Sequence, residues 1–258
     1  LVTTKPDTKL KDLMKTLIYS VHTNTDQEEV AEIVARYNLL AVPVLDVDDK
    51  LVGIITVDDV IDVIREEATE DILKISGTGE ISITSHSIWK NVKARAPWLF
   101  ATLISGILAS QIIGLLSIGI ENLVLITAFL PIVMAMGGNV GTQSAAMISR
   151  GLATGEISLK TGWRIFARQF AIGVVLGIVY GLSLSIFVGV RYLQYKMPLI
   201  VALSICANIS IAAITGTVIP MLFERIKMDP AIASGPFVTT SSDILGIVLY
   251  FTIAKIIL

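Results

Sequence analysis

Residues 233–254 read ASGPFVTTSSDILGIVLYFTIA and contain a single charged residue, Asp243. The stretch is long and apolar enough to cross a membrane as a helix, which takes about 20 residues. An isolated carboxylate at mid-bilayer costs at least about 2.5–3.5 kcal/mol on insertion scales, so it rarely faces lipid. We therefore predict that Asp243 faces a bundle interior or a watery path and meets a cation there.

A second stretch, residues 131–151, reads PIVMAMGGNVGTQSAAMISRG. Glycines in membrane helices usually mark close helix packing, and the spacing of Gly137 and Gly141 fits that interpretation. Four of the six residues from 139 to 144 are polar, however, and polar side chains are costly against lipid. The stretch could also open backbone carbonyls at membrane depth. Together with Asp243, it predicts a passage for a hard, oxygen-seeking cation.

The rest of the carboxyl-terminal part is equally apolar. The chain is 53% hydrophobic, with a mean hydropathy of +0.76. With Asp243 set aside, five runs without charge are long enough to span a bilayer as helices, the form that satisfies every backbone group in lipid. These runs are residues 96–120, 122–149, 169–190, 197–223 and 230–254. The predicted fold is an α-helical membrane protein with five transmembrane helices per subunit.

The charges divide the chain into two parts. Residues 1–95 carry 17 acids and 11 bases, whereas residues 96–258 carry 5 acids and 9 bases. Bases cluster within residues 90–95, 150–168 and 225–227, which the positive-inside rule assigns to the cytoplasm. We therefore expect a multi-pass protein of the cell membrane (inner or plasma membrane), with its amino-terminal part in the cytoplasm and its carboxyl terminus outside.

The acidic part has the pattern of a small α/β unit. Residues 26–38 have apolar positions at helical spacing, 39–45 and 51–57 are typical of strands, and 57–76 predict an acidic helix. Residues 85–100 then predict an amphipathic helix next to the membrane, with Pro97 marking a bend into the first span. The expected domains are residues 1–75, a connecting helix over 76–96 and a membrane domain over 97–258.

The acidic helix carries a possible cation site. Its acids repeat at spacings of three and four residues, so many of them share a face and repel one another. A solvated face is the plain interpretation. Carboxylates alone would suit Mg²⁺ or Ca²⁺, which predicts a sensor of divalent cations. The acids concerned are Asp59, Asp62, Glu66, Glu67, Glu70 and Asp71.

Enzymatic chemistry finds no support in the sequence. It has no nucleophile–base constellation and no phosphate-binding P-loop, so we do not expect an enzyme. Its single cysteine, Cys206, excludes an intrachain disulfide and is expected to be a small buried thiol. The expected partners are membrane lipid and divalent cations, and no nucleic acid.

The soluble unit resembles a cystathionine-β-synthase (CBS) domain. The resemblance lies in AVPVLD at residues 41–46 and in GIITVDD at residues 53–59. It implies that Thr56 and Asp59 hold the phosphate and ribose of a nucleotide such as ATP. Alternatively, the two residues only cap the following helix. CBS domains work in pairs, and a piece at residues 1–14 resembles the end of a preceding unit.

Residues 131–151, with the soluble unit before them and SSDILG after them, resemble the MgtE family of magnesium channels. The resemblance implies a homodimer with five spans per subunit, in which spans two and five line one central pore. Asp243 is then the pore carboxylate, and residues 76–96 are a plug that closes the pore when intracellular Mg²⁺ binds the sensor. Pore oxygens would come from Ala135, Gly138 and Thr239, with Asn139 and Thr142 nearby; the sensor acids are Asp59, Asp62, Glu67, Glu70 and Asp71.

Three functions remain open at this point. The first is a gated, passive Mg²⁺ channel. The second is a coupled transporter of divalent metal with Asp243 as a proton or sodium relay, which would call for more charged residues within the membrane. The third is a non-conducting receptor that senses nucleotide, in which Asp243 would pair with a base. Lys255, however, is about 18 Å away along a helix, which favours a mobile cation.

Overall fold

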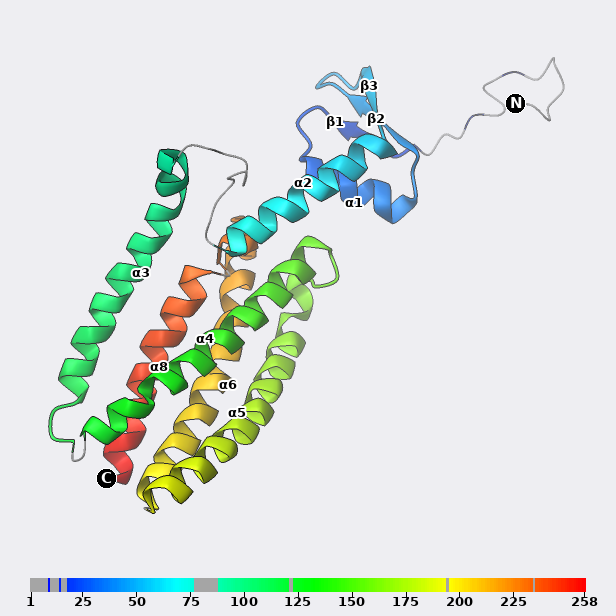
Figure 1. Ribbon diagram of the computed structural model, residues 1–258. Helices are drawn as coiled ribbons and strands as arrows, with labels where there is room; N and C mark the ends of the chain where they lie inside the picture. The colour runs from blue at the N-terminus through cyan, green and yellow to red at the C-terminus, as the bar shows by residue number, and fades with distance from the viewer. Residues whose placement is uncertain are drawn as a thin grey trace. The chain divides into compact units, whose positions relative to one another are not determined.

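The computed structural model describes residues 9, 14, 18–76, 88–120, 123–193, 195–233 and 235–258. The chain divides into two compact units, Leu1–Thr69 and Glu70–Leu258 (Figure 1). The first contains a small sheet with helices, and the second contains the long apolar helices. Each unit is described separately below.

The first unit has the predicted order of helix, strand, turn, strand and helix. Its elements are β1 (Val21–His22), α1 (Gln27–Tyr37), β2 (Ala41–Leu45), β3 (Leu51–Thr56) and the beginning of α2 (Val57–Ile75). The three strands form a sheet in the order β1-β2-β3, with β1 parallel and β3 antiparallel to β2. The predicted α/β unit is confirmed, and the two-residue strand β1 is an addition to it.

Local signals explain where α1 begins and ends. The carboxylate of Asp26 accepts a hydrogen bond of 2.9 Å from the backbone N–H of Glu28, which caps the first turn. Asn38 takes the left-handed conformation, with φ 49°, and ends the helix. Between these caps, Val30 and Val34 turn inward and pack with Val42 of β2. This small apolar core holds the helix against the sheet.

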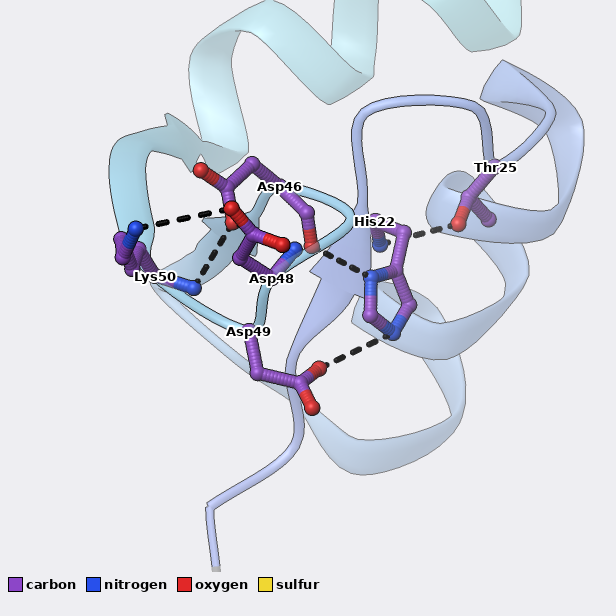
Figure 2. A network of polar contacts seen from close by, with 6 residues as sticks. All are labelled: His22, Thr25, Asp46, Asp48, Asp49 and Lys50. Atoms are coloured by element: carbon purple, nitrogen blue, oxygen red, sulfur yellow. Dashed lines mark hydrogen bonds and ion pairs between the residues drawn. The ribbon is translucent and has the colours of Figure 1, made fainter.

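The turn between β2 and β3 is built around Asp46 (Figure 2). One oxygen of its carboxylate accepts 2.9 Å hydrogen bonds from the backbone N–H groups of Asp48 and Lys50. His22 of β1 lies beside this turn, with Nδ1 3.2 Å from the Asp46 carbonyl oxygen and Nε2 3.8 Å from the carboxylate of Asp49. The Asp46 carboxylate of this turn is therefore bonded to the backbone of the turn itself, and the Asp46 carbonyl and the Asp49 carboxylate face His22 of β1.

Among its described residues, the second unit contains five helices that are long and apolar enough to cross a membrane. This confirms the predicted fold class. They are α3 (Ile88–Leu116), α4 (Leu123–Ala153), α5 (Gly162–Tyr192), α6 (Lys196–Arg225) and α8 (Pro236–Ile257).

Two short elements accompany these helices. They are the 3₁₀ helix η2 (Leu159–Thr161) and α7 (Pro230–Ala233). The predicted fifth run is thus divided, because α8 starts afresh at Pro236, a residue suited to the first turn of a helix.

Helix α6 packs against three of its neighbours, α4, α5 and α8, and α3 packs against α8 (Figure 1). The buried cluster between them includes Ile126 and Val133 of α4, Ile205 and Ile209 of α6, and Tyr250 of α8. Helix α6 can occupy this central position because its own residues are apolar or small on most of its sides.

The contact between α5 and α6 depends on three glycines spaced four residues apart. A Cβ added to Gly173 would lie 3.0 Å from the Cα of Ser210, and one added to Gly177 would lie 2.7 Å from the Cα of Cys206. At Gly181 it would lie 2.7 Å from a backbone carbonyl oxygen of α6. The two backbones therefore touch along two turns, as small residues permit in membrane helices.

A single helix covers the end of the predicted connecting helix and the beginning of the first span. Helix α3 runs from Ile88 to Leu116 without a break and includes Pro97. The last part of the predicted connecting helix, residues 88–96, is therefore continuous with the first span. Pro97 removes one backbone hydrogen bond without ending the helix. The rest of the predicted connecting helix, residues 77–87, lies outside the described residues.

Candidate functional site

Helices α4 and α8 fix the height of Asp243. A Cβ added to Gly141 of α4 would lie 2.9 Å from Oγ of Ser242 and 3.1 Å from Cγ1 of Val238. Gly137 of α4 and Gly246 of α8 both lie against one side chain of α6, described below. The two helices are thus antiparallel, with 141 level with 242 and 137 level with 246. It follows that Asp243 stands level with the turn from residue 138 to residue 141.

The predicted pore residues of α4 share one face. Ala135 and Asn139 are exposed, and Gly138 and Thr142 are partly exposed. A Cβ added to Gly138 would meet no heavy atom within 4 Å among the residues that the structure describes, whereas its neighbour Gly137 is tightly packed. The two adjacent glycines therefore differ by position: Gly137 packs inside the helix bundle, and Gly138 belongs to a face that the described residues leave uncovered.

The carboxylate of Asp243 is partly buried. Within the described ranges it makes no hydrogen bond and no ion pair. Thr239 lies one turn earlier on α8, four residues away and so on the same side of the helix. An anionic group with free lone pairs at this depth is suited to bind a cation.

Two threonine hydroxyls near this level are already used by the backbone. The Thr142 hydroxyl donates at 3.0 Å to the carbonyl oxygens of Gly138 and Asn139. The Thr239 hydroxyl lies 3.3 Å from the carbonyl oxygen of Gly235 and 3.2 Å from that of Pro236. Inside α4 the Gly138 carbonyl also accepts a hydrogen bond from the backbone N–H of Thr142, so a water on an ion would have to replace the hydroxyl bond to reach this oxygen.

The predicted sensor acids all lie on α2, but several of them already bond to other side chains of this protein. Glu67 accepts a hydrogen bond from Nε2 of Gln27, and Asp59 accepts one of 2.9 Å from the Thr56 hydroxyl. No three Asp, Glu, His or Cys side chains gather as metal ligands within the described ranges, so Asp62 and Asp71 join no such group there. The acids therefore lie on one helix, but the described residues of a single chain do not bring three of them together as a metal site.

Glu70 takes part in a three-residue ion cluster within the second unit. The Lys74 ammonium contacts the carboxylate of Glu70 and lies 2.7 Å from that of Asp229, which precedes α7. Burial of the ammonium opposes its charge, but the hydrogen bonds to Asp229 and Glu70 outweigh that effect and raise the pKa of Lys74 above its ordinary value. The end of α2 is thereby tied to the segment between α6 and α8.

The two predicted nucleotide-binding residues contact each other. Thr56 is the residue before α2, and its hydroxyl donates to the Asp59 carboxylate three positions later. The same carboxylate lies 3.5 Å from the Thr56 backbone nitrogen. This is the reciprocal arm of a capping box, so the capping interpretation accounts for both residues.

Sequence reasoning missed two buried polar side chains that join the helices. Nδ2 of Asn208 in α6 donates at 2.6 Å to the carbonyl oxygen of Val133, and the Tyr250 hydroxyl in α8 donates at 2.7 Å to that of Ile126. Asn208 is only 1% exposed. The signal was present, since Asn208 is a lone amide in the charge-free run 197–223, where the argument used for Asp243 applies equally.

Comparison with known proteins supports this architecture. Residues 130–253 match the family model MgtE, described as a divalent cation transporter, and residues 10–66 match that of the CBS domain. Residues 130–253, which include two of the five apolar helices found among the described residues and most of two more, are therefore similar to a divalent cation transporter, and residues 10–66 are similar to a CBS domain.

Three curated relatives match nearly the whole length of this chain in sequence. The magnesium transporter MgtE of Bacillus subtilis is 37% identical over 254 residues, covering 98% of this chain and 56% of the relative. Those of Enterococcus faecalis and Thermus thermophilus are 36% and 34% identical, over 99% and 100% of this chain and 56% and 58% of theirs. The chain is thus similar to these MgtE transporters over nearly all of its own length.

The match has a limited extent along these relatives. The chain spans about half the length of the curated relatives that it matches. A crystal structure of the soluble part of a magnesium transporter is 49% identical, with a TM-score of 0.26, and the match covers 26% of each chain.

Proposed function

We propose that this chain forms a pore for Mg²⁺ and that Asp243 is its central carboxylate. The observation that carries the proposal is that Asp243 has no partner among the described residues and lies level with residues 138–141, next to a polar face of α4 that those residues leave uncovered. The three curated relatives, all magnesium transporters by name, support the choice of ion.

The coordination chemistry of Mg²⁺ favours a site of this kind. Mg²⁺ loses its water reluctantly and is usually held by one or two carboxylates together with several waters. Two copies of Asp243, related by a two-fold axis, would supply two carboxylates. Backbone oxygens of Ala135, Gly138 and Thr239 would then accept hydrogen bonds from the waters on the ion. Binding through water also stays weak enough for the ion to leave.

A second copy of the chain completes this proposal. The face with Ala135, Asn139 and Thr142 carries polar groups that would be costly against hydrocarbon. In a homodimer, the same face of each subunit would meet its partner across a two-fold axis and leave a central path. The bases around the spans support an orientation with the amino-terminal part in the cytoplasm and Leu258 outside.

Regulation is assigned to the acids of α2. The predicted sensor acids repel their neighbours when Mg²⁺ is scarce, and a second α2 would supply the missing ligands of each site when Mg²⁺ is abundant. These acids are Asp59, Asp62, Glu67, Glu70 and Asp71. Binding there would draw residues 88–96, the beginning of α3, toward the pore entrance. Nucleotide binding by Thr56 and Asp59 is left as a separate question, since capping already occupies both.

Ion flux into liposomes tests the proposal. The protein is reconstituted at fixed pH with a Mg²⁺-sensitive dye inside, and Mg²⁺, Ca²⁺, Mn²⁺ and Co²⁺ are compared. Passive flux that follows the Mg²⁺ gradient without a proton or sodium gradient supports a channel. Flux that requires such a gradient supports the coupled transporter instead, and no flux of any cation would contradict both and favour a receptor.

A further inference from the structure

The buried amide of Asn208 lies between two glycines from different helices. A Cβ added to Gly137 of α4 would lie 2.8 Å from the Asn208 side-chain carbon Cγ, and one added to Gly246 of α8 would lie 2.5 Å from Oδ1. Any residue larger than glycine at either position would collide with the amide. The absence of a side chain at Gly137 and at Gly246 therefore leaves a slot between α4 and α8, and the Asn208 side chain of α6 fills it.

Only one of the two polar groups of the Asn208 amide has a hydrogen-bond partner among the described residues. Its Nδ2 donates to the carbonyl oxygen of Val133 at 2.6 Å, while Oδ1 is buried and has no hydrogen-bond partner among the described residues. Leaving a buried acceptor unpaired costs about 1–3 kcal/mol. A side chain chosen for stability alone would be apolar here, since an apolar group of the same shape avoids that cost. The retained amide therefore indicates a role in position.

The slot lies directly beside the proposed site. Gly246 is three residues, or nearly one helical turn, after Asp243, and Gly137 adjoins Gly138 on α4. One side chain therefore sets both the spacing and the rotation of the two helices at the height where the carboxylate faces the 138–141 turn. Close-packed interiors transmit such displacements because they contain little free space.

We propose that Asn208 is a positioning residue for ion passage, fixing the distance between Asp243 and the α4 turn by filling the slot between Gly137 and Gly246. The inference rests on the proposed function for its transport readout. Its structural consequence, a changed α4–α8 spacing, is independent of whether the ion is Mg²⁺.

Two substitutions test it from opposite sides. Asn208→Leu removes the bond to Val133, and Gly246→Ala pushes a methyl group into the slot. We expect each to raise the Mg²⁺ concentration for half-maximal flux about tenfold and to reduce the preference for Mg²⁺ over Co²⁺. Combining Gly246→Ala with Asn208→Ala provides space for the new methyl and should restore part of both values, because contacting residues are energetically coupled.

A matched control is available on the same helix. Ser204 is fully buried, its hydroxyl has no partner among the described residues, and it lies one turn before Asn208. Ser204→Ala should leave flux and selectivity unchanged. A purely structural role for Asn208 would lower the melting temperature and the amount of active protein without changing the half-maximal concentration or the ion preference.

Spin labels separate failure of the inference from failure of the proposed function. Cysteines replace the exposed Met147 and Leu245 in a Cys206→Ala background, and the α4–α8 distance is measured in nanodiscs. A distance that shifts in Asn208→Leu and Gly246→Ala but not in Ser204→Ala supports the positioning role, even where wild-type Mg²⁺ flux is absent. Unchanged distances and unchanged ion preference in both variants would overturn it.

Discussion

The hydroxyl of Tyr250 donates a 2.7 Å hydrogen bond to the carbonyl oxygen of Ile126, and both residues are fully buried. This bond joins α8 to the turn of α4 that precedes Pro131, where the proline removes a backbone donor. Together with Asn208 and Val133, it gives α4 two side-chain contacts to its backbone, one from each neighbouring helix.

Tyr250→Phe should therefore destabilise the helix bundle while leaving the ion path intact. The change leaves the second acceptor site of the Ile126 carbonyl without its partner, and such losses cost about 1–3 kcal/mol. Thermal unfolding in detergent would measure the effect, with Tyr180→Phe as a control because Tyr180 is 46% exposed. Equal melting temperatures for the two variants would contradict the assignment.

Asp243→Asn should abolish Mg²⁺ flux and leave the oligomeric state unchanged. Asparagine keeps the size of the side chain but removes the charge that a divalent cation requires. Liposome flux and size-exclusion chromatography are the two measurements. Thr252→Ala serves as the control, since Thr252 is exposed on the same helix and bonds only to the Val248 carbonyl. Wild-type flux in Asp243→Asn would remove Asp243 from the site.

Substitutions at Gly138 and Gly141, nearly one turn apart on α4, should have different effects. Gly141→Val would drive a branched side chain into Ser242 and Val238, so we expect loss of folded protein. In Gly138→Val the new side chain would enter a space in which the described residues place no atom within 4 Å of its Cβ. We therefore expect the chain to fold normally, while permeation or dimer contact is blocked. The yield of folded protein and the flux are compared for both. Similar folding defects would show that Gly138 is also a packing position.

Neutralising the sensor acids should remove the inhibition of flux by internal Mg²⁺. The variant carries Asn or Gln in place of Asp59, Asp62, Glu67, Glu70 and Asp71, and flux is measured at low and millimolar internal Mg²⁺.

Loss of the Lys74 ion cluster complicates that variant, because Glu70 also contacts Lys74. Lys74→Met is therefore the matched control, since it removes the cluster and retains all five acids. If Lys74→Met alone abolishes inhibition, the cluster and not Mg²⁺ binding by the acids controls closure.

Much of this fold follows from simple patterns in the sequence. Runs without charge predicted the five spans, and the caps at Asp26 and Asn38 lie at the ends of the predicted helix over 26–38. Gly137 and Gly138 show where such reasoning stops. Adjacent glycines look identical in sequence, and only the positions of α6 and α8 reveal that the first is packed and the second is open. The slot for Asn208 likewise joins three helices that no local pattern relates.

The glycines of α5 have a mechanical consequence. With Gly173, Gly177 and Gly181 seated directly on the α6 backbone, the two helices can slide past each other only if each glycine moves to the next small-residue notch. One such step is four residues, or about 6 Å of travel at 1.5 Å per residue. Small sliding movements between α5 and α6 are therefore sterically opposed. If the chain forms the proposed pore, we expect opening movements to involve α3, α4 or α8 shifting against this pair.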